Sequence, residues 1–163
     1  MKTSIYSALL LMSVTVIPSL CFAQAGVEPS KASITKQFDV WNNALKTGKA
    51  EQVAALYCEP GGVLIPTLSN RVRSNRAEIA DYFEHFLLLK PSGRINESYI
   101  RILGPGMAIN SGIYTFQLTK AGKPEAVKAR YTFVYAKQQG HWCIMEQHSS
   151  AMPESESAPA VAH

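Results

Sequence analysis

Residues 126–150 read AVKARYTFVYAKQQGHWCIMEQHSS, and this stretch decides the fold class. It contains two runs rich in β-branched and aromatic residues, Ala126 to Lys137 and His141 to Ser150, with a Gln-Gln-Gly turn signal between them. Two similar runs precede it, Ile95 to Leu103 and Met107 to Leu118, which also end at turn signals. Short connections join consecutive strands as antiparallel hairpins. The C-terminal half is therefore expected to form an antiparallel meander.

The N-terminal half has helical periodicity instead. Spacings of four, three and four residues trace one face of a helix, at Ile34, Phe38, Trp41 and Leu45. A second, shorter helix is expected over residues 53–57, and Val63-Leu64-Ile65 predicts a short strand. Asn75 followed by Glu78 is a capping-box arrangement that opens a third helix. Helices followed by strands indicate an α+β fold, in which the helices cover one face of a curved antiparallel sheet.

Composition and length indicate one globular domain. The chain has 163 residues, of which 47% are hydrophobic and 17% charged, and this balance is far from that of a disordered chain. We divide the sequence into a secretory signal peptide over residues 1–25, a leader over residues 26–32, the domain over residues 33–153 and a disordered tail over residues 154–163.

The signal peptide is predicted from three features: Lys2, the apolar run from Ile5 to Ile17, and the small-x-small site Ala23-Gln24-Ala25. The apolar run is too short for a spanning helix, so no stable membrane anchor is expected. The predicted location is periplasmic or secreted.

The net charge of +4 is mild and does not indicate a nucleic-acid-binding protein. The cluster Arg71, Arg73 and Arg76 has no interleaved aromatic residues and is interpreted as a solvated turn. Cys58 and Cys143 either form a disulfide or stay as small buried residues, since sequence does not show their separation. There is no cysteine and histidine spacing typical of a metal site, and no cofactor is predicted.

Six strings carry a resemblance to a known family. They are WNNALKTGK (Trp41 to Lys49), VLIPTLSNRVR (Val63 to Arg73), IADYFEHFL (Ile79 to Leu87), GIYTF (Gly112 to Phe116), ARYTFVY (Ala129 to Tyr135) and WCIMEQHSSAMP (Trp142 to Pro153). In their order they resemble the nuclear-transport-factor-2-like superfamily, the cone-shaped fold that ketosteroid isomerase also has. Within it they resemble proteins related to the association domain of calcium/calmodulin-dependent protein kinase II, from Ser33 to Pro153.

The resemblance implies a single pocket between sheet and helices, and self-association into a dimer or a larger ring. It does not imply kinase activity, because the glycine-rich loop, HRD and DFG motifs of a kinase are absent from the sequence. Arg130 matches the pocket arginine with which the association-domain family holds carboxylates. Its planar guanidinium suits a carboxylate, and the alternative is a structural ion pair with an acid such as Glu146.

Other candidate residues come from the same strands and helices. If the last strand is regular, Glu146 and His148 share one face and are a candidate acid/base pair, although the favoured interpretation of His148 is a hydrogen-bonded structural histidine. Tyr57 and Tyr114 are candidate hydroxyl donors, and Trp41 and Phe83 candidate lining residues; the alternative is that all four are core. Asp81, Glu84 and His85 are interpreted as solvated helix surface.

Three functions remain open from sequence. One is a binding module for a small organic anion held by Arg130, with no chemistry. Another is an isomerase, dehydratase or lyase that acts on a small hydrophobic substrate through His148 and Glu146. No aspartate lies in the long predicted strands, and this counts against an isomerase like ketosteroid isomerase. The last is an assembly protein whose sheet surface drives oligomerisation.

Overall fold

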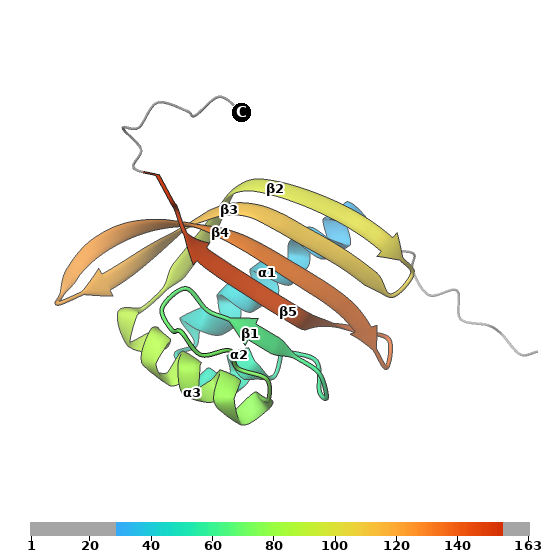
Figure 1. Cartoon of the computed structure of the whole chain (residues 1–163), viewed down its shortest axis with the longest axis horizontal. Coiled ribbons are helices and arrows are strands. Elements are labelled where there is room, and N and C mark those ends of the chain that lie inside the picture. The colour runs from blue at the N-terminus through green and yellow to red at the C-terminus, as the bar shows by residue number, and fades with distance from the viewer. Residues whose placement is uncertain (1–28, 155–163) are drawn as a thin grey trace, which may run out of the picture.

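The computed structural model describes residues 29–154, so the predicted signal peptide and all but the first residue of the predicted tail lie outside the described residues. The elements follow the expected order (Figure 1): α1 (Lys31–Lys46), α2 (Ala50–Ala54), β1 (Val63–Ile65), α3 (Arg76–Phe86), the 3-10 helix η1 (Leu87–Leu89), β2 (Ser92–Gly104), β3 (Met107–Lys120), β4 (Lys123–Gln138) and β5 (His141–Ala151). The predicted α+β class is confirmed.

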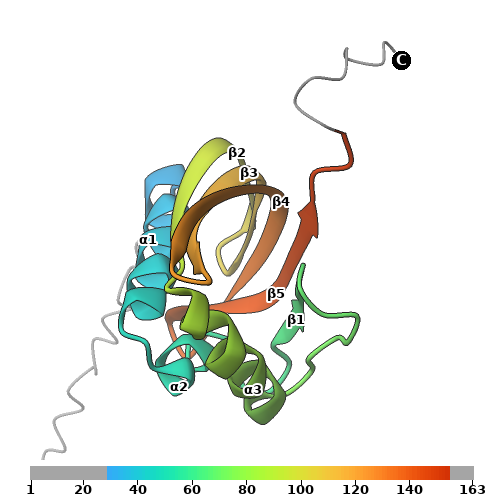
Figure 2. The same ribbon diagram turned by 90° about the vertical axis from the view of Figure 1, so that its left-hand side faces the viewer.

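The five strands form one sheet in the order β1-β5-β4-β3-β2. β1 runs parallel to β5, and the other neighbours are antiparallel. The sheet is open and strongly curved, and Figure 2 shows the three α-helices gathered on one side of it. The concave face of the sheet therefore faces these helices.

The helix ends follow the sequence signals. Ser30 and Ser33 form a reciprocal capping box at the start of α1, and Gly48 lies just beyond its end with φ +67°. At α3, the Asn75 side chain accepts the Glu78 backbone N–H at 3.0 Å, while the Glu78 carboxylate accepts the N–H of Ser74. The predicted start of the third helix is confirmed. The Glu78 carboxylate, however, accepts from Ser74, one residue before the N-cap, instead of from the N-cap Asn75 itself.

The hairpins are tighter than expected. β3 and β4 continue to Lys120 and Lys123, so only Ala121 and Gly122 form the turn, with φ of 49° and 78°. Two consecutive left-handed residues are the pattern of a two-residue turn whose twist matches that of the strands. The sequence predicted that the strands end at Leu118 and resume at Ala126, whereas Lys123 and Pro124 still belong to the ladder.

A disulfide joins Cys58 to Cys143, with the Cα atoms 4.9 Å apart. It links the segment after α2 to the start of β5, where the Cys58 N–H donates to the carbonyl of Ile144 at 2.9 Å. The pairing that the sequence left open is therefore formed. It ties the N-terminal helical half of the domain to its last strand.

Strand alternation builds the core. On β4 the side chains of Ala129, Tyr131, Phe133 and Tyr135 are buried, and Phe133 packs against Phe38 and Trp41 of α1. The Trp41 and Phe133 rings lie 5.3 Å apart in an edge-to-face contact. Trp41 is thus a core residue on one side, and its other side borders the pocket.

Candidate functional site

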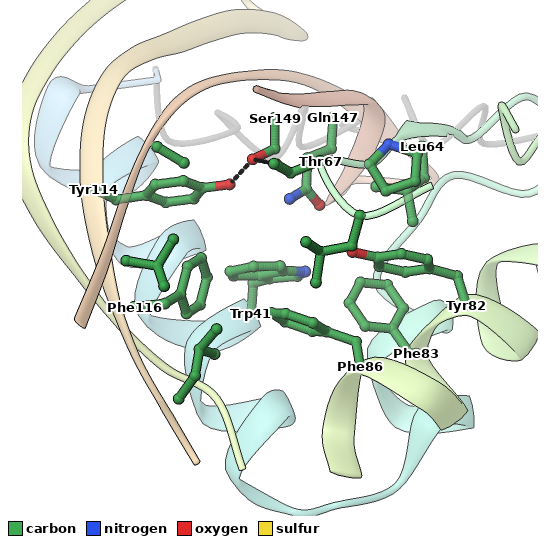
Figure 3. Close-up of a pocket in the computed structure, with 15 residues that line it drawn as sticks. Trp41, Leu64, Thr67, Tyr82, Phe83, Phe86, Tyr114, Phe116, Gln147 and Ser149 are labelled. Atoms are coloured by element: carbon green, nitrogen blue, oxygen red, sulfur yellow. Dashed lines mark hydrogen bonds between the residues drawn. The ribbon is translucent and has the colours of Figure 1, made fainter. Parts of the chain in front are cut away.

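A narrow pocket lies between the concave face of the sheet and helices α1 and α3 (Figure 3). Its cavity volume is about 50 Å³, less than the roughly 150 Å³ of a cavity that holds benzene. Aromatic and aliphatic side chains dominate a wall made by Trp41, Leu64, Pro66, Thr67, Leu68, Tyr82, Phe83, Phe86, Tyr114, Phe116, Leu118, Val127, Ala129, Gln147 and Ser149. No carboxylate, lysine, arginine or histidine is among these lining residues.

Three hydroxyl groups meet at the sheet side of the pocket. Tyr114 of β3 and Thr67, which follows β1, both donate to Ser149 Oγ of β5 at 2.5 Å. Three hydroxyls carry three protons, and the two contacts use two of them. One O–H is therefore left for an acceptor outside the group.

Gln147 adds a second polar group beside Ser149. Its Oε1 accepts the hydroxyl proton of Tyr57, which assigns the amide nitrogen to the other side. Burial raises the pKa of Tyr114, and the nearby Ser149 and Gln147 side chains lower it by less. The Gln147 N–H donors thus lie beside the Tyr114 hydroxyl, at the pocket wall.

The Trp41 indole supplies the third polar feature. Burial raises the pKa of Tyr57, and the Trp41 N–H lowers it by less. The two groups are near each other without a hydrogen bond of good geometry, because Trp41 Nε1 is buried and has no partner. Figure 3 shows this nitrogen turned toward the middle of the pocket. A buried N–H without an acceptor is uncommon and costs free energy.

The pocket is uncharged at neutral pH. Its titratable lining residues are Tyr82 and Tyr114. Burial raises the pKa of Tyr82 to about 12 and that of Tyr114 further. Both phenols therefore stay protonated, and Tyr114 donates a hydrogen bond to Ser149. The pKa of neither phenol is close to 7, where the pKa of a general acid or base works best at neutral pH.

Arg130 does not lie in the pocket, so this prediction was wrong. It is exposed on the convex face of β4, between Ile113 of β3 and Ser150 of β5. The reason is strand parity: its neighbours Ala129 and Tyr131 point inward, so Arg130 points outward. No ion pair joins it to Glu146 within residues 29–154.

Glu146 and His148 are likewise exposed on the convex face, so the predicted acid/base pair does not reach the pocket. β5 is not regular: its register to β4 shifts between Val134 and Tyr135, which leaves Met145 as an extra residue. A bulge of this kind reverses the side-chain alternation beyond it. Ile144 is buried before the bulge, and the next inward residues are Gln147 and Ser149.

The other candidates are partly brought together. Trp41, Phe83 and Tyr114 line the pocket, and Tyr57 stands one layer behind it through Gln147. That any of them binds a ligand stays a prediction. Sequence reasoning missed Gln147 and Thr67. Inverting the alternation after Met145 would have identified Gln147, but no signal marks Thr67.

No group of three metal-ligating side chains occurs in the part of the chain that the structure describes. None of its described helices is long and apolar enough to cross a membrane.

The comparison with family models decides what kind of protein this is. Residues 30–153 match the model of the calcium/calmodulin dependent protein kinase II association domain. The chain belongs to this association-domain family. The match spans the whole described fold, from the cap of α1 to the end of β5. No curated protein sequence matches the chain.

Solved structures of the same fold support this. A Xanthomonas campestris protein, described as a calcium/calmodulin dependent protein kinase II association domain, is 44% identical over 91% of this chain and 100% of its own, with a TM-score of 0.75. A calcium/calmodulin dependent protein kinase II hub homology domain from Chlamydomonas reinhardtii is 18% identical over 74% of this chain and 97% of its own, with a TM-score of 0.61. A protein of the NTF2-like family from Streptomyces avermitilis, named for a dehydratase, is 12% identical over 74% and 95%, with a TM-score of 0.66. The last two show the shared nuclear-transport-factor-2-like fold alone.

Proposed function

We propose that this association-domain protein is an exported, self-associating binding module, whose pocket takes a small, mainly apolar ligand that carries a hydrogen-bond acceptor. The observation that carries the proposal is an aromatic pocket with unpaired donors. Trp41 Nε1 has no acceptor, and the group of Thr67, Ser149 and Tyr114 has one hydroxyl proton to spare. A carbonyl or ether oxygen between them would satisfy both.

The lining residues favour a neutral acceptor over an organic anion. The anion expected from sequence rested on Arg130, and that guanidinium is on the convex face. A carboxylate among neutral donors and aromatic rings would lose its hydration without a counter-charge. The same absence of a cation or carboxylate among the lining residues argues against an isomerase or lyase that works through a paired acid and base.

The volume limits the ligand. A cavity of about 50 Å³ holds only a few heavy atoms unless side chains at its mouth move. Two of the lining side chains are not buried: Leu68 is 57% exposed, and Phe86 is half-buried. Rotation of these two side chains would enlarge the pocket without disturbing the sheet.

Ligand binding is tested by thermal shift against small aromatic ketones, ethers and amides, because a ligand at a hundred times its dissociation constant stabilises by about 2.7 kcal/mol. Trp41→Phe removes the indole N–H, and Trp142→Phe is the matched control, since Trp142 packs under Lys137 away from this pocket. We expect Trp41→Phe to weaken binding about fivefold, the value of one neutral hydrogen bond. Equal affinities in the two variants would contradict the proposal.

Self-association is proposed through the convex face of the sheet. Large apolar side chains are exposed on β2 and β3 there, with Tyr99 64% and Leu103 55% exposed. Ile109 and Val134 lie side by side at the middle of this face and are half-buried. Exposed apolar surface of this kind marks interaction sites. The family of kinase association domains points in the same direction.

Light scattering on the protein from residue 26 onward tests the assembly. We expect a dimer or a larger ring, and Val134→Asp is expected to shift it to monomer. Gln117→Asp places the same charge at an exposed position near the C-terminal end of β3, between Ser92 of β2 and Ala126 of β4, and is the control that keeps the assembly. A wild-type monomer at micromolar concentration would refute this part.

Export is proposed from the signal-peptide pattern of residues 1–25 and is supported by the Cys58–Cys143 disulfide, because disulfides persist in oxidising compartments. The intact mass of the protein recovered from a bacterial periplasmic fraction is expected to start at Gly26. Recovery of the full-length chain from the cytoplasm alone would contradict export.

A further inference from the structure

An outer cavity of about 340 Å³ shares a wall with the aromatic pocket. Three side chains, Leu68, Tyr82 and Phe86, line both of them and form the partition between them. The remaining wall of the outer cavity is Ser69, Arg73, Asp81, His85 and Leu89. The aromatic pocket alone is far smaller than the roughly 300 to 1,000 Å³ of small-molecule sites, whereas the outer cavity falls within that range.

Helix α3 carries the partition and the polar wall of the outer cavity as two neighbouring rows. Tyr82 and Phe86 are four residues apart, so they share one face of the helix, and their stacked rings lie 5.9 Å apart. Asp81 and His85 have the same spacing one residue earlier and form the adjacent row. Figure 3 shows the rings of Tyr82 and Phe86 at the border of the aromatic pocket. A molecule that crosses this border passes from aromatic rings to polar groups.

The partition has one fixed member and two that can turn. Burial raises the pKa of Tyr82, and a hydrogen bond from the Leu68 backbone opposes this effect, so the phenol is held in place. Phe86 is half-buried and packs edge-on against Phe116, with ring centroids 5.7 Å apart. The Leu68 side chain is 57% exposed, and exposed side chains change rotamer within nanoseconds. Rotation of Leu68 therefore opens the partition without the loss of a ring contact.

The two cavities have opposite hydrogen-bonding character. The aromatic pocket has spare donors, at Trp41 Nε1 and in the hydroxyl group around Ser149. In the outer cavity, His85 Nδ1 lies 2.9 Å from the Asp81 backbone carbonyl, so this contact assigns the proton of the neutral ring to Nδ1 and leaves Nε2 as an acceptor. The Asp81 carboxylate is 57% exposed and is also an acceptor. The outer cavity therefore favours a ligand group that donates a hydrogen bond.

The charges in the outer wall offset each other. Arg73 has a side chain only 10% exposed, so the solvated turn predicted from sequence was wrong for this residue. Its Nη2 lies 3.7 Å from Asp81 Oδ2, and this ion pair offsets the charge of the carboxylate. An ammonium group near Asp81 would also be repelled by the guanidinium. A neutral donor, such as a hydroxyl group, is therefore the better match.

We propose that one ligand spans both cavities, with an aromatic ring and its carbonyl or ether oxygen in the aromatic pocket and a short chain that ends in a hydroxyl group in the outer cavity. The chain crosses the partition where Leu68 turns outward. The inference rests on the proposed function of the aromatic pocket and adds the second half of the ligand. It makes a pocket of about 50 Å³ the inner end of a site of ordinary size.

The test is calorimetric titration of the protein from residue 26 onward with acetophenone, para-ethylacetophenone and para-(hydroxyethyl)acetophenone. We expect the hydroxyethyl compound to bind about fivefold more tightly than the ethyl compound, the value of one neutral hydrogen bond. The double variant Asp81→Ala and His85→Ala removes both acceptors and is expected to equalise the two. Glu84→Ala removes an exposed carboxylate of the same helix that lines neither cavity, and it is the control that keeps the ratio.

A second pair of variants tests the partition without touching the buried ion pair. Leu68→Ala shortens the partition, so the two chain-bearing compounds are expected to bind severalfold more tightly relative to acetophenone, because the closed form no longer competes. Leu88→Ala is the matched control, since Leu88 is 76% exposed and lines neither cavity. If the double variant does not fold by circular dichroism, the wild-type ratio and this pair decide.

Equal affinity of the ethyl and hydroxyethyl compounds for the wild type overturns the proposal, and so does a ratio that persists in the folded double variant. Tighter binding of para-(aminoethyl)acetophenone than of the hydroxyethyl compound overturns the assignment of a neutral chain. Unchanged relative affinities in Leu68→Ala overturn the route across the partition. Acetophenone reports on the aromatic pocket alone: if it binds while the two chains are equal, only the spanning ligand fails, and if no compound binds, the proposed function fails with it.

Discussion

Removing the disulfide is the perturbation whose size follows most directly from the structure. Cys58 and Cys143 are 85 residues apart in sequence, and the bond closes a loop of that length in the unfolded chain. The loop-closure entropy for such a length corresponds to about 4.5 kcal/mol of stability at 25 °C. For a domain of this size the same change lowers Tm by on the order of 15 °C.

The variant to measure carries Cys58→Ala together with Cys143→Ala. Cys58 is buried, so alanine adds a small packing loss to the entropic effect, whereas a serine would add an unpaired hydroxyl. Urea unfolding at equilibrium, followed by circular dichroism, gives the free energy of unfolding of the wild-type protein with and without reductant, and of the double variant. We expect the double variant to be slightly less stable than the reduced wild type, because of the packing loss, and reductant to have no effect on the variant.

A loss below about 1 kcal/mol would refute this reasoning. It would mean that the unfolded chain gains little freedom when the bond is absent, or that strain in the folded protein cancels the gain. A loss near the full value would explain how a fold with an open sheet keeps its first helices attached to β5. Of those helices, α1 contributes Trp41 to the wall of the aromatic pocket.

Three further changes have expected results. Gly112→Ala should lower the free energy of unfolding by about 2 kcal/mol or more in urea titration, because its Cβ would lie 2.0 Å from a backbone oxygen of β2. The control Gly104→Ala, whose Cβ would meet open space, should change this free energy very little. Asn42→Ala should cost about 2 kcal/mol and speed hydrogen exchange at the Gly93 amide, because the Asn42 side chain accepts that N–H at 2.8 Å and donates to the Gly93 carbonyl at 2.9 Å. Burial raises the pKa of Tyr82 to about 12, so the stabilising effect of its protonated form is complete below about pH 10 and is lost as pH rises through 12. Between these values the free energy of unfolding of the wild type should fall by about 1.4 kcal/mol per pH unit more than that of Tyr82→Phe.

The fold was predictable because its signals are local and mutually consistent. Helical spacing in α1, the cap at Asn75 and the turn glycines each fix one element without knowledge of the rest. The antiparallel order then follows from short connections. Only the parallel pairing of β1 with β5 is non-local, and no sequence signal near Val63 announces it.

The site was less predictable because it depends on side-chain direction rather than on element type. In β4 simple alternation already assigns Arg130 to the convex face, once the buried side chains of Tyr131 and Phe133 are recognised as one row. In β5 alternation fails at Met145, and a single extra residue exchanges Glu146 and His148 for Gln147 and Ser149 at the pocket. A bulge of one residue leaves no periodic signal, so the charged pair and the neutral pair were equally compatible with the sequence.

The position of the charged residues on the convex face also determines what they can do. Arg130, Glu146 and His148 lie on the convex face, which is the face proposed for self-association. Charged groups at an interface mainly set orientation and partner choice, while apolar groups such as Val134 supply most of the affinity. The pocket, in contrast, has kept only neutral donors and rings, and the charge that the fold does bury sits one wall away at Arg73. The proposed ligand pocket and the proposed self-association surface therefore lie on opposite faces of the sheet, so a substitution at Val134 and one at Trp41 test the two proposals separately.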